Sequence, residues 1–203
     1  MTSPTLVHPR PPRQERTRAG WERILATGLE LLNEGGWEAL TIAEVCRRAG
    51  VTAPSIYARV DGRAGLFSAV YEHGMMLVER TEREAFGDLS RSDDDRVEAV
   101  VGAFVEIFVT HEAFLRAVIR YSSSNPPLLQ RGSEEAQRIT RLVARALPFP
   151  PVSGLIIGRL LFSECLVRVM YGETFYDSRG ESRKHFVAHL TRIAKAIGTD
   201  AKS

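Results

Sequence analysis

Apolar residues recur at helical spacing along most of the chain, and no segment shows the strict alternation of a half-buried strand. Glycine pairs, proline clusters and short polar runs separate the periodic stretches, and such residues end helices. The acidic run Asp93–Asp95 is suited to a helix N-terminus. The pattern predicts an all-α protein of about nine helices, at residues 17–33, 41–49, 53–59, 63–86, 97–108, 114–119, 128–147, 152–171 and 181–197.

One segment in the N-terminal third carries the capping signals of two short helices joined by a tight turn. Thr41 and Glu44 have the spacing of a capping box, in which each side chain accepts a backbone N–H near the helix start. Gly50 allows the left-handed backbone conformation that a sharp turn needs. Thr52 is the expected cap of the second helix, with Pro54 in its first turn. Two short helices in this order predict a helix-turn-helix.

The second helix has residue types that suit contact with nucleic acid. Ala53 lets the backbone approach a groove, and Ser55 and Tyr57 offer hydroxyls to phosphates. The inward packing of Ile56 and its neighbours predicts that Arg59 faces outward. In that orientation Arg59 can bind O6 and N7 of guanine. An ordinary helical corner, with Tyr57 half-buried and Arg59 solvated, has the same pattern. The residues alone therefore leave both interpretations open.

The turn and the second helix continue without a gap into a longer signature, AGVTAPSIYARVDGRAGLF. With its flanks, residues 16–70, it resembles the DNA-binding domain of the tetracycline-repressor (TetR) family, whose pattern is close to AGV[ST]…LYxHFxxKxxLL. Arg63 stands at the family's phosphate-binding lysine, and Arg59 replaces a common histidine. Ala43 stands where many relatives carry a basic residue that reads bases. The resemblance implies phosphate contacts from Thr41, Thr52, Ser55, Tyr57 and Arg63, and base contacts from Ala53 and Arg59.

The resemblance also implies a domain plan and a function. It places a helix-turn-helix DNA-binding domain at residues 16–67 and a helical domain for effector binding and dimerisation at 68–203. Residues 1–15 hold four of the ten prolines and show no periodicity, so we expect a disordered basic arm there. The implied protein is a ligand-responsive transcriptional regulator, most often a repressor, that binds a palindromic DNA operator as a homodimer. A small apolar effector would release it from DNA. The alternative is a helical ligand-binding or adaptor protein without DNA-binding activity.

Charge and cysteine content agree with this interpretation. The net charge is only +2, and residues 1–67 hold nine arginines and seven acidic residues, whereas the rest of the chain is balanced. Cys46 and Cys165 each lie in an apolar stripe, which excludes a disulfide framework and fits a reduced, cytoplasmic setting. The most apolar stretch, residues 152–172, carries charged side chains, so no membrane span is predicted.

The sequence offers little chemistry for catalysis. It contains no glycine-rich phosphate loop, no HExxH motif and no nucleophile with an evident base, so we predict no enzyme and no cofactor. His185 and His189 are one helical turn apart, but two histidines without a third ligand do not predict a metal site. Helix 152–171 is apolar nearly all round and needs cover on several sides, for which a second copy of the chain is a natural source.

The predicted C-terminal domain supplies aromatic and apolar side chains with few polar groups. A pocket built from them would take a mostly apolar small molecule, held by one or two hydrogen bonds. Core packing explains any single one of these side chains better than a pocket does. The candidate effector contacts are Phe104, Phe108, His111, Tyr121, Phe162 and Glu164.

Overall fold

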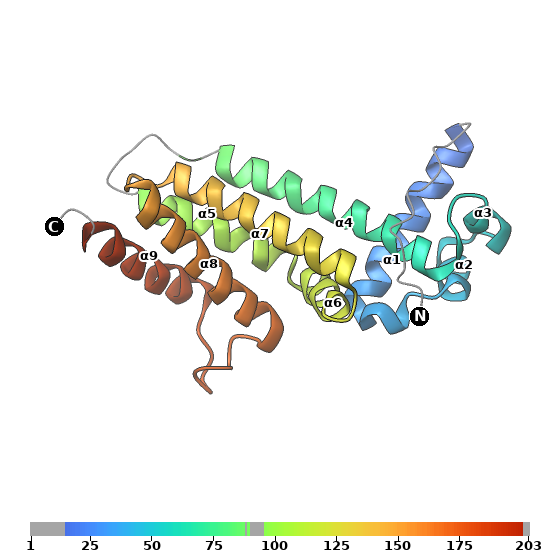
Figure 1. Ribbon diagram of the computed structural model, residues 1–203. Helices are drawn as coiled ribbons and strands as arrows, with labels where there is room; N and C mark the ends of the chain where they lie inside the picture. Colours follow the sequence, from blue (N-terminus) through green and yellow to red (C-terminus); the bar gives the residue numbers. More distant parts are fainter. Residues whose placement is uncertain (1–14, 88, 90–95, 201–203) are drawn as a thin grey trace. The chain divides into compact units, whose positions relative to one another are not determined.

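The structure, a computed structural model, describes residues 15–87, 89 and 96–200, which form nine α-helices and no strand (Figure 1). They are α1 (Glu15–Ala39), α2 (Ile42–Ala49), α3 (Ala53–Tyr57), α4 (Gly62–Gly87), α5 (Arg96–Thr110), α6 (Glu112–Ser122), α7 (Pro126–Ala146), α8 (Pro151–Tyr171) and α9 (Arg183–Asp200). The all-α prediction is confirmed. Residues 1–14 of the predicted arm and the run Asp93–Asp95 lie outside the described residues. None of the described helices is both long and apolar enough to cross a membrane.

Most helices begin or end within three residues of the predicted bounds, and two of the differences bear on the helix-turn-helix. The helical conformation of α1 breaks at the predicted glycine pair, where Gly36 has φ of +66°, but a further helical turn reaches Ala39. Helix α3 ends at Tyr57, two residues earlier than predicted. The backbone N–H of Arg59 donates to the carbonyl of Ile56 at 2.9 Å, which tightens the chain into a turn there.

The chain divides into two compact units, and each is built from two segments. Unit 1 comprises Met1–Val78 and Ala113–Leu129, and unit 2 comprises Glu79–Glu112 and Gln130–Ser203. Helices α4 and α7 therefore each contribute to both units. The boundary at residue 67 between two functional domains stays a prediction.

Unit 1 is formed by α1, α2, α3, the first part of α4, and α6. Phe67 of α4 is 2% exposed and packs against two aromatic rings, Trp37 at 5.4 Å and Tyr121 at 4.5 Å between centroids. Gly74 of α4 lies directly against the ring of Phe114, where any Cβ would collide with it. Aromatic packing therefore joins α6 to α1 and α4, although 24 residues separate the end of α4 from the start of α6 in sequence.

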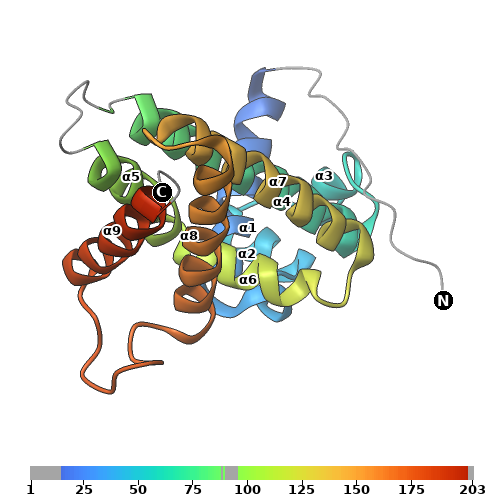
Figure 2. The same ribbon diagram turned by 60° about the vertical axis from the view of Figure 1, so that its left-hand side comes forward.

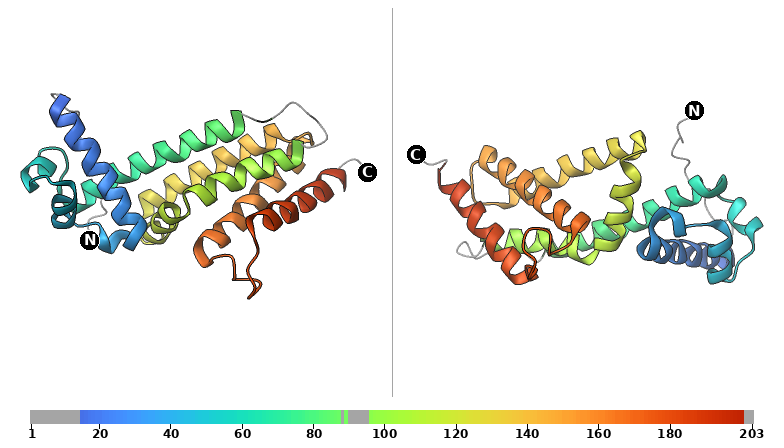
Figure 3. Two further views of the ribbon diagram at one scale, coloured as in Figure 1. Left: turned by 180° about the vertical axis from the view of Figure 1, so that it is seen from behind. Right: turned by 90° about the horizontal axis from the view of Figure 1, so that it is seen from below.

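Unit 2 has α5 packed beside α8 and α9, as the views in Figures 2 and 3 show. The predicted stripe of α5 is buried, with Val100, Val101, Phe104 and Val105 all fully inside. Helix α8 approaches α7 closely, since a Cβ on Gly158 would stand 2.9 Å from the carbonyl oxygen of Thr140. The apolar faces of these helices thus form one core.

An ion pair holds the last part of α4 to α7 within unit 2. Both terminal nitrogens of Arg138 donate to the carboxylate of Glu82, at 2.7 and 2.6 Å. Glu82 is only 7% exposed, whereas Arg138 is open to solvent. Because a buried carboxylate is costly without a partner, this pair ties the end of α4 to α7.

Candidate nucleic-acid interface and effector residues

The start of α2 carries one half of the predicted capping box. The hydroxyl of Thr41 accepts the backbone N–H of Glu44 at 3.2 Å. The return bond is not formed, because the Glu44 carboxylate accepts hydrogen bonds from Arg47 and Arg48, at 2.6 to 2.9 Å. The hydrogen bonds from these two arginines lower the pKa of Glu44 to about 2, with Arg47 the larger contribution. Arg48 also pairs with Glu34 of α1, and so connects α2 to α1.

The turn between α2 and α3 has the predicted geometry. Gly50 has φ of +63° and ψ of +39°, the left-handed conformation that glycine adopts at low cost. Thr52 occupies the position before α3, but its side chain makes no capping hydrogen bond, contrary to prediction. Instead, the Ser55 hydroxyl donates to the carbonyl oxygen of Thr52. The hydroxyl oxygens of Thr52 and Ser55 lie 3.4 Å apart.

The exposed face of α3 carries the hydroxyl groups that the sequence singled out. Thr52 and Ser55 are exposed and Tyr57 is 52% exposed, while Ala53 is partly covered. Ile56 is completely buried, which confirms its predicted inward position. Thr41 lies half-buried at the start of α2. The two helix starts therefore present hydroxyls together with the positive ends of their backbone dipoles.

Arg59 does not face outward, so that expectation is wrong. Its side chain is 7% exposed, and its guanidinium carbon lies 5.0 Å from the centre of the Trp21 ring. Burial lowers the pKa of Arg59. The turn after Tyr57 directs Arg59 back toward α1, where the indole face attracts a cation. Arg59 thereby anchors the C-terminal end of α3 to α1.

Arg63, at the start of α4, binds backbone carbonyls at the end of α1. Its Nε donates to the carbonyl of Leu40 at 2.7 Å, and its Nη2 donates to those of Trp37 and Glu38. The guanidinium also lies 4.1 Å from the centre of the Trp37 ring. An arginine can make this forked contact, whereas a lysine offers only a point charge. Arg63 therefore holds the residues that immediately precede α2.

Helix α2, the turn at Gly50 and helix α3 together form a helix-turn-helix. The chain is therefore a helix-turn-helix protein. Residues 24–70 match the family model for bacterial regulatory proteins of the tetR family. Over 74 residues the chain is 34% identical to the tetracycline repressor protein class C of Escherichia coli. That match covers 36% of this chain and 31% of the repressor's length. Residues 24–70 therefore form a domain of the tetR family of bacterial regulatory proteins.

Solved structures share the fold over most of the chain. A transcriptional regulator from Streptomyces coelicolor A3(2) has a TM-score of 0.68 and 19% sequence identity, and the match covers 89% of this chain and 98% of the regulator's chain. A TetR-like transcriptional regulator from Rhodococcus sp. RHA1 has a TM-score of 0.66 at 16% identity, covering 91% and 96%. At these identities the likeness establishes the fold.

Three of the six candidate effector residues lie together in unit 2. The rings of Phe104 and Phe108 are 5.1 Å apart, and Phe162 meets Phe108 edge-on at 5.7 Å. Phe104 is fully buried, whereas Phe162 is partly exposed and lines a hollow of about 430 Å³ between α7 and α8. The aromatic series thus runs from the core of unit 2 to that hollow.

The other three candidates are dispersed. The imidazole of His111 shares a hydrogen bond with the Thr81 hydroxyl at 2.8 Å, and burial is the main cause of its lowered pKa. Glu164 is half-buried on α8. Tyr121 belongs to unit 1, where its ring stacks on Trp37 at 4.4 Å. Sequence spacing could not assign Tyr121 to a unit, because the chain returns to unit 1 after α5.

Proposed function

We propose that the chain is a ligand-responsive transcriptional regulator, which binds a palindromic DNA operator as a homodimer. The observation that carries the proposal is the helix-turn-helix with its exposed hydroxyls, within a segment that matches a family of regulatory proteins. Repression, with release by a small apolar effector, is the proposed direction. A dimer of such motifs places two reading helices on successive turns of one DNA face.

The DNA contacts that we propose come from the exposed residues. The hydroxyls of Thr52 and Tyr57, and that of Thr41 at the start of α2, donate hydrogen bonds to phosphates, and Ala53 lies over the bases. Ser55 joins them when its hydroxyl turns from the carbonyl oxygen of Thr52 to a phosphate. Arg59 and Arg63 are proposed to position these groups, in place of the direct contacts that the family resemblance implies. Their guanidiniums are occupied by Trp21 and by the carbonyls before α2, respectively.

Operator binding tests this assignment. The full chain is expected to bind DNA from upstream of its own gene with an affinity that falls steeply as salt rises. Tyr57→Phe is expected to weaken binding several-fold, because a phosphate contact of about 0.5 to 1.5 kcal/mol is lost. The matched control is Tyr176→Phe, which alters an exposed tyrosine of unit 2. Fluorescence anisotropy at several salt concentrations measures both variants.

Two results would contradict the proposal. If the chain binds no upstream DNA even at low salt, a ligand-binding or adaptor function without DNA binding replaces it. If Tyr57→Phe and Tyr176→Phe weaken binding equally, the exposed face of α3 is not the DNA-contacting surface.

The dimer is supported by exposed apolar side chains on α8. Val152 is 70% exposed, Ile156 is 50% exposed and Leu155 is 39% exposed. Side chains of this kind favour burial against a second copy, and a two-fold interface would double each contact. Light scattering after size-exclusion chromatography is expected to give about twice the chain mass of 22.6 kDa. Ile156→Asp is expected to lower the measured mass, whereas wild-type chain at 22.6 kDa and micromolar concentration would rule out the dimer.

Helix α4 is the proposed link between effector and DNA. Its first turn holds the residues before α2 through Arg63, and its last turns are paired to α7 through Glu82. An effector that changes the position of α7 would thus act on the last turns of α4, and the helix continues without a break from there to Arg63. The effector can shift DNA binding only through different affinities for the two states, typically by about 1 to 3 kcal/mol.

A further inference from the structure

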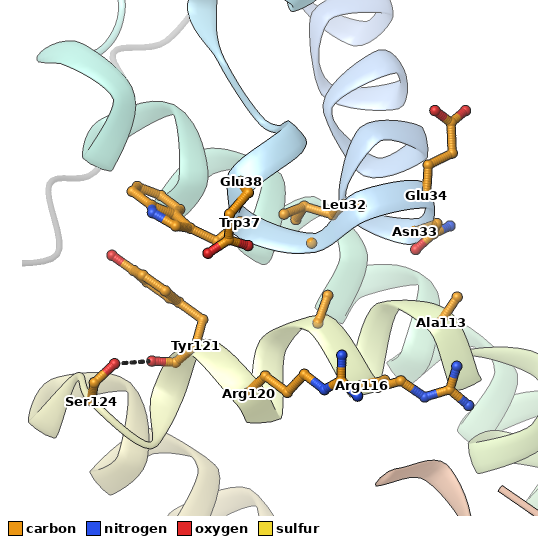
Figure 4. A pocket seen from close by; sticks show the side chains of 13 residues that line it. Leu32, Asn33, Glu34, Trp37, Glu38, Ala113, Arg116, Arg120, Tyr121 and Ser124 are labelled. Carbon is orange, nitrogen blue, oxygen red and sulfur yellow. Dashed lines mark hydrogen bonds between the residues drawn. The ribbon is translucent and has the colours of Figure 1, made fainter. Parts of the chain in front are cut away.

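A hollow of about 600 Å³ lies in unit 1, between the end of α1 and α6 (Figure 4). The ring of Trp37 in its lining is covered by Tyr121 at 4.4 Å and by Arg63 at 4.1 Å, so it has no open face for a ligand. Leu32 and Ala117 of the same lining are buried. This hollow therefore offers a ligand little apolar surface.

A second hollow, of about 430 Å³, lies between α7 and α8, and all of its lining residues belong to unit 2. The two helices run in opposite directions and come very close together there. A Cβ on Gly154 would stand 2.9 Å from the Cα of Ala144, and a Cβ on Gly158 would stand 2.9 Å from the carbonyl oxygen of Thr140. Residues beside these contacts form the two walls of the hollow.

Each wall contributes one arginine, Arg141 from α7 and Arg159 from α8. The two positions directly follow Thr140 and Gly158, which are in contact, so the arginines start side by side. Both are exposed, and within the described part of the chain neither makes an ion pair or a hydrogen bond. None of the described residues that line the hollow is acidic. Two unpartnered guanidinium groups favour an anion between them, and they bind carboxylate oxygens through paired N–H donors.

The rest of the lining suits a short apolar body and a hydroxyl group. Phe162 of α8 is partly exposed and Ala136 of α7 is half-buried, and both lie past the arginines along the hollow. Ser163 and Ser133 are exposed at the far end. At about 1.5 Å of rise per residue, Ser163 lies about 6 Å and Ser133 about 12 Å from the arginine of its own helix.

We propose that the effector is a small amphipathic carboxylate that binds in this hollow. Its carboxylate would lie between Arg141 and Arg159, its apolar body against Phe162 and Ala136, and a hydroxyl group would bond to the serines at the far end. The proposal rests on the ligand-responsive function proposed above, and it adds a charged head to the apolar effector. Because Arg138 ties α7 to the end of α4, a ligand between α7 and α8 would bear on the last turns of α4.

Titration calorimetry on the full chain without DNA tests the site, with 4-hydroxycinnamate as the probe and 4-hydroxycinnamamide as its neutral counterpart. We expect one saturable site per chain for the acid and about tenfold weaker binding of the amide, because charged hydrogen bonds are lost. Arg159→Gln is expected to weaken the acid about tenfold without affecting the amide. Arg145→Gln, which removes an exposed charge one turn after Arg141 and outside the hollow, is the control and should change neither.

Ala136→Leu tests the location without changing charge. It fills part of the hollow and is expected to weaken both compounds, while thermal unfolding stays near that of the wild type. Equal affinity for acid and amide, an unchanged affinity in Arg159→Gln, or no saturable binding below about 1 mM would overturn the proposal. Inorganic phosphate bound as tightly as the probe, or a lower mass of Arg159→Gln in light scattering, would overturn it as well. The hollow would then be a general anion site or an interface between two copies.

Operator binding with and without the probe separates this proposal from the function on which it rests. The probe is expected to shift the operator affinity of the wild type but not that of Arg159→Gln. Saturable binding of the probe with an unchanged operator affinity would overturn its role as an effector. A chain that binds the probe but no upstream DNA would contradict the proposed regulator, while the calorimetry still decides the binding site.

Discussion

Replacing Phe104 by alanine is expected to lower the free energy of unfolding by about 3 to 5 kcal/mol, the cost of removing a fully buried phenylalanine. The ring is 0% exposed and packs at 5.1 Å against Phe108 in the centre of unit 2. A protein of this length loses about 2 to 4 °C of melting temperature for each kcal/mol, so the transition should fall by roughly 10 °C. Thermal denaturation at constant protein concentration measures it.

Phe162→Ala is the matched control for this prediction. Phe162 belongs to the same aromatic series but borders the hollow between α7 and α8, so its removal leaves less buried volume empty. We expect a clearly smaller loss of stability from this variant. Equal losses of stability in the two variants would mean that Phe162 is as much a part of the core as Phe104. Phe162 would then no longer be a candidate effector contact.

The second large effect is expected at Arg63. Arg63→Ala should lower the free energy of unfolding by about 1.5 to 3 kcal/mol, because charged hydrogen bonds to the carbonyls before α2 are lost. Arg63→Lys keeps the positive charge but cannot reproduce the forked contact. Its free energy of unfolding should therefore fall by more than half of the decrease expected for Arg63→Ala. Chemical denaturation of both variants measures these losses, with Arg80→Ala, an exposed charge on α4, as the control.

The same variants separate a positioning role from a phosphate contact. If Arg63 bound a phosphate directly, Arg63→Ala would reduce the slope of log affinity against log salt by about 0.9. If it positions α2, the slope stays unchanged at temperatures where the variant is folded, and affinity falls at every salt concentration. A reduced slope combined with unchanged stability would contradict the positioning role.

Local signals made the helix-turn-helix predictable from sequence. Thr41 and Gly50 act on backbone groups within a few residues, so their chemistry can be inferred without knowledge of the fold. The same holds for the buried position of Ile56, which follows from helical spacing.

The two arginines were beyond the reach of such reasoning. Arg59 contacts Trp21, and Arg63 contacts the carbonyl of a residue 23 positions earlier, just after the end of α1. In a short motif, exposed and buried arginines have the same sequence pattern. Only the packing of α1 against α2 and the start of α4 distinguishes a guanidinium that faces solvent from one that holds the backbone.

Because unit 1 is assembled from two separate stretches of chain, exchange of parts between related genes meets a constraint. A recombination that replaced everything after Val78 would also replace α6, whose Phe114 and Tyr121 pack against Gly74, Phe67 and Trp37. The incoming sequence would have to supply side chains of matching size at those two positions. A new unit 2 can therefore be inherited only together with an α6 that fits the old unit 1, which favours gradual divergence over exchange of whole units.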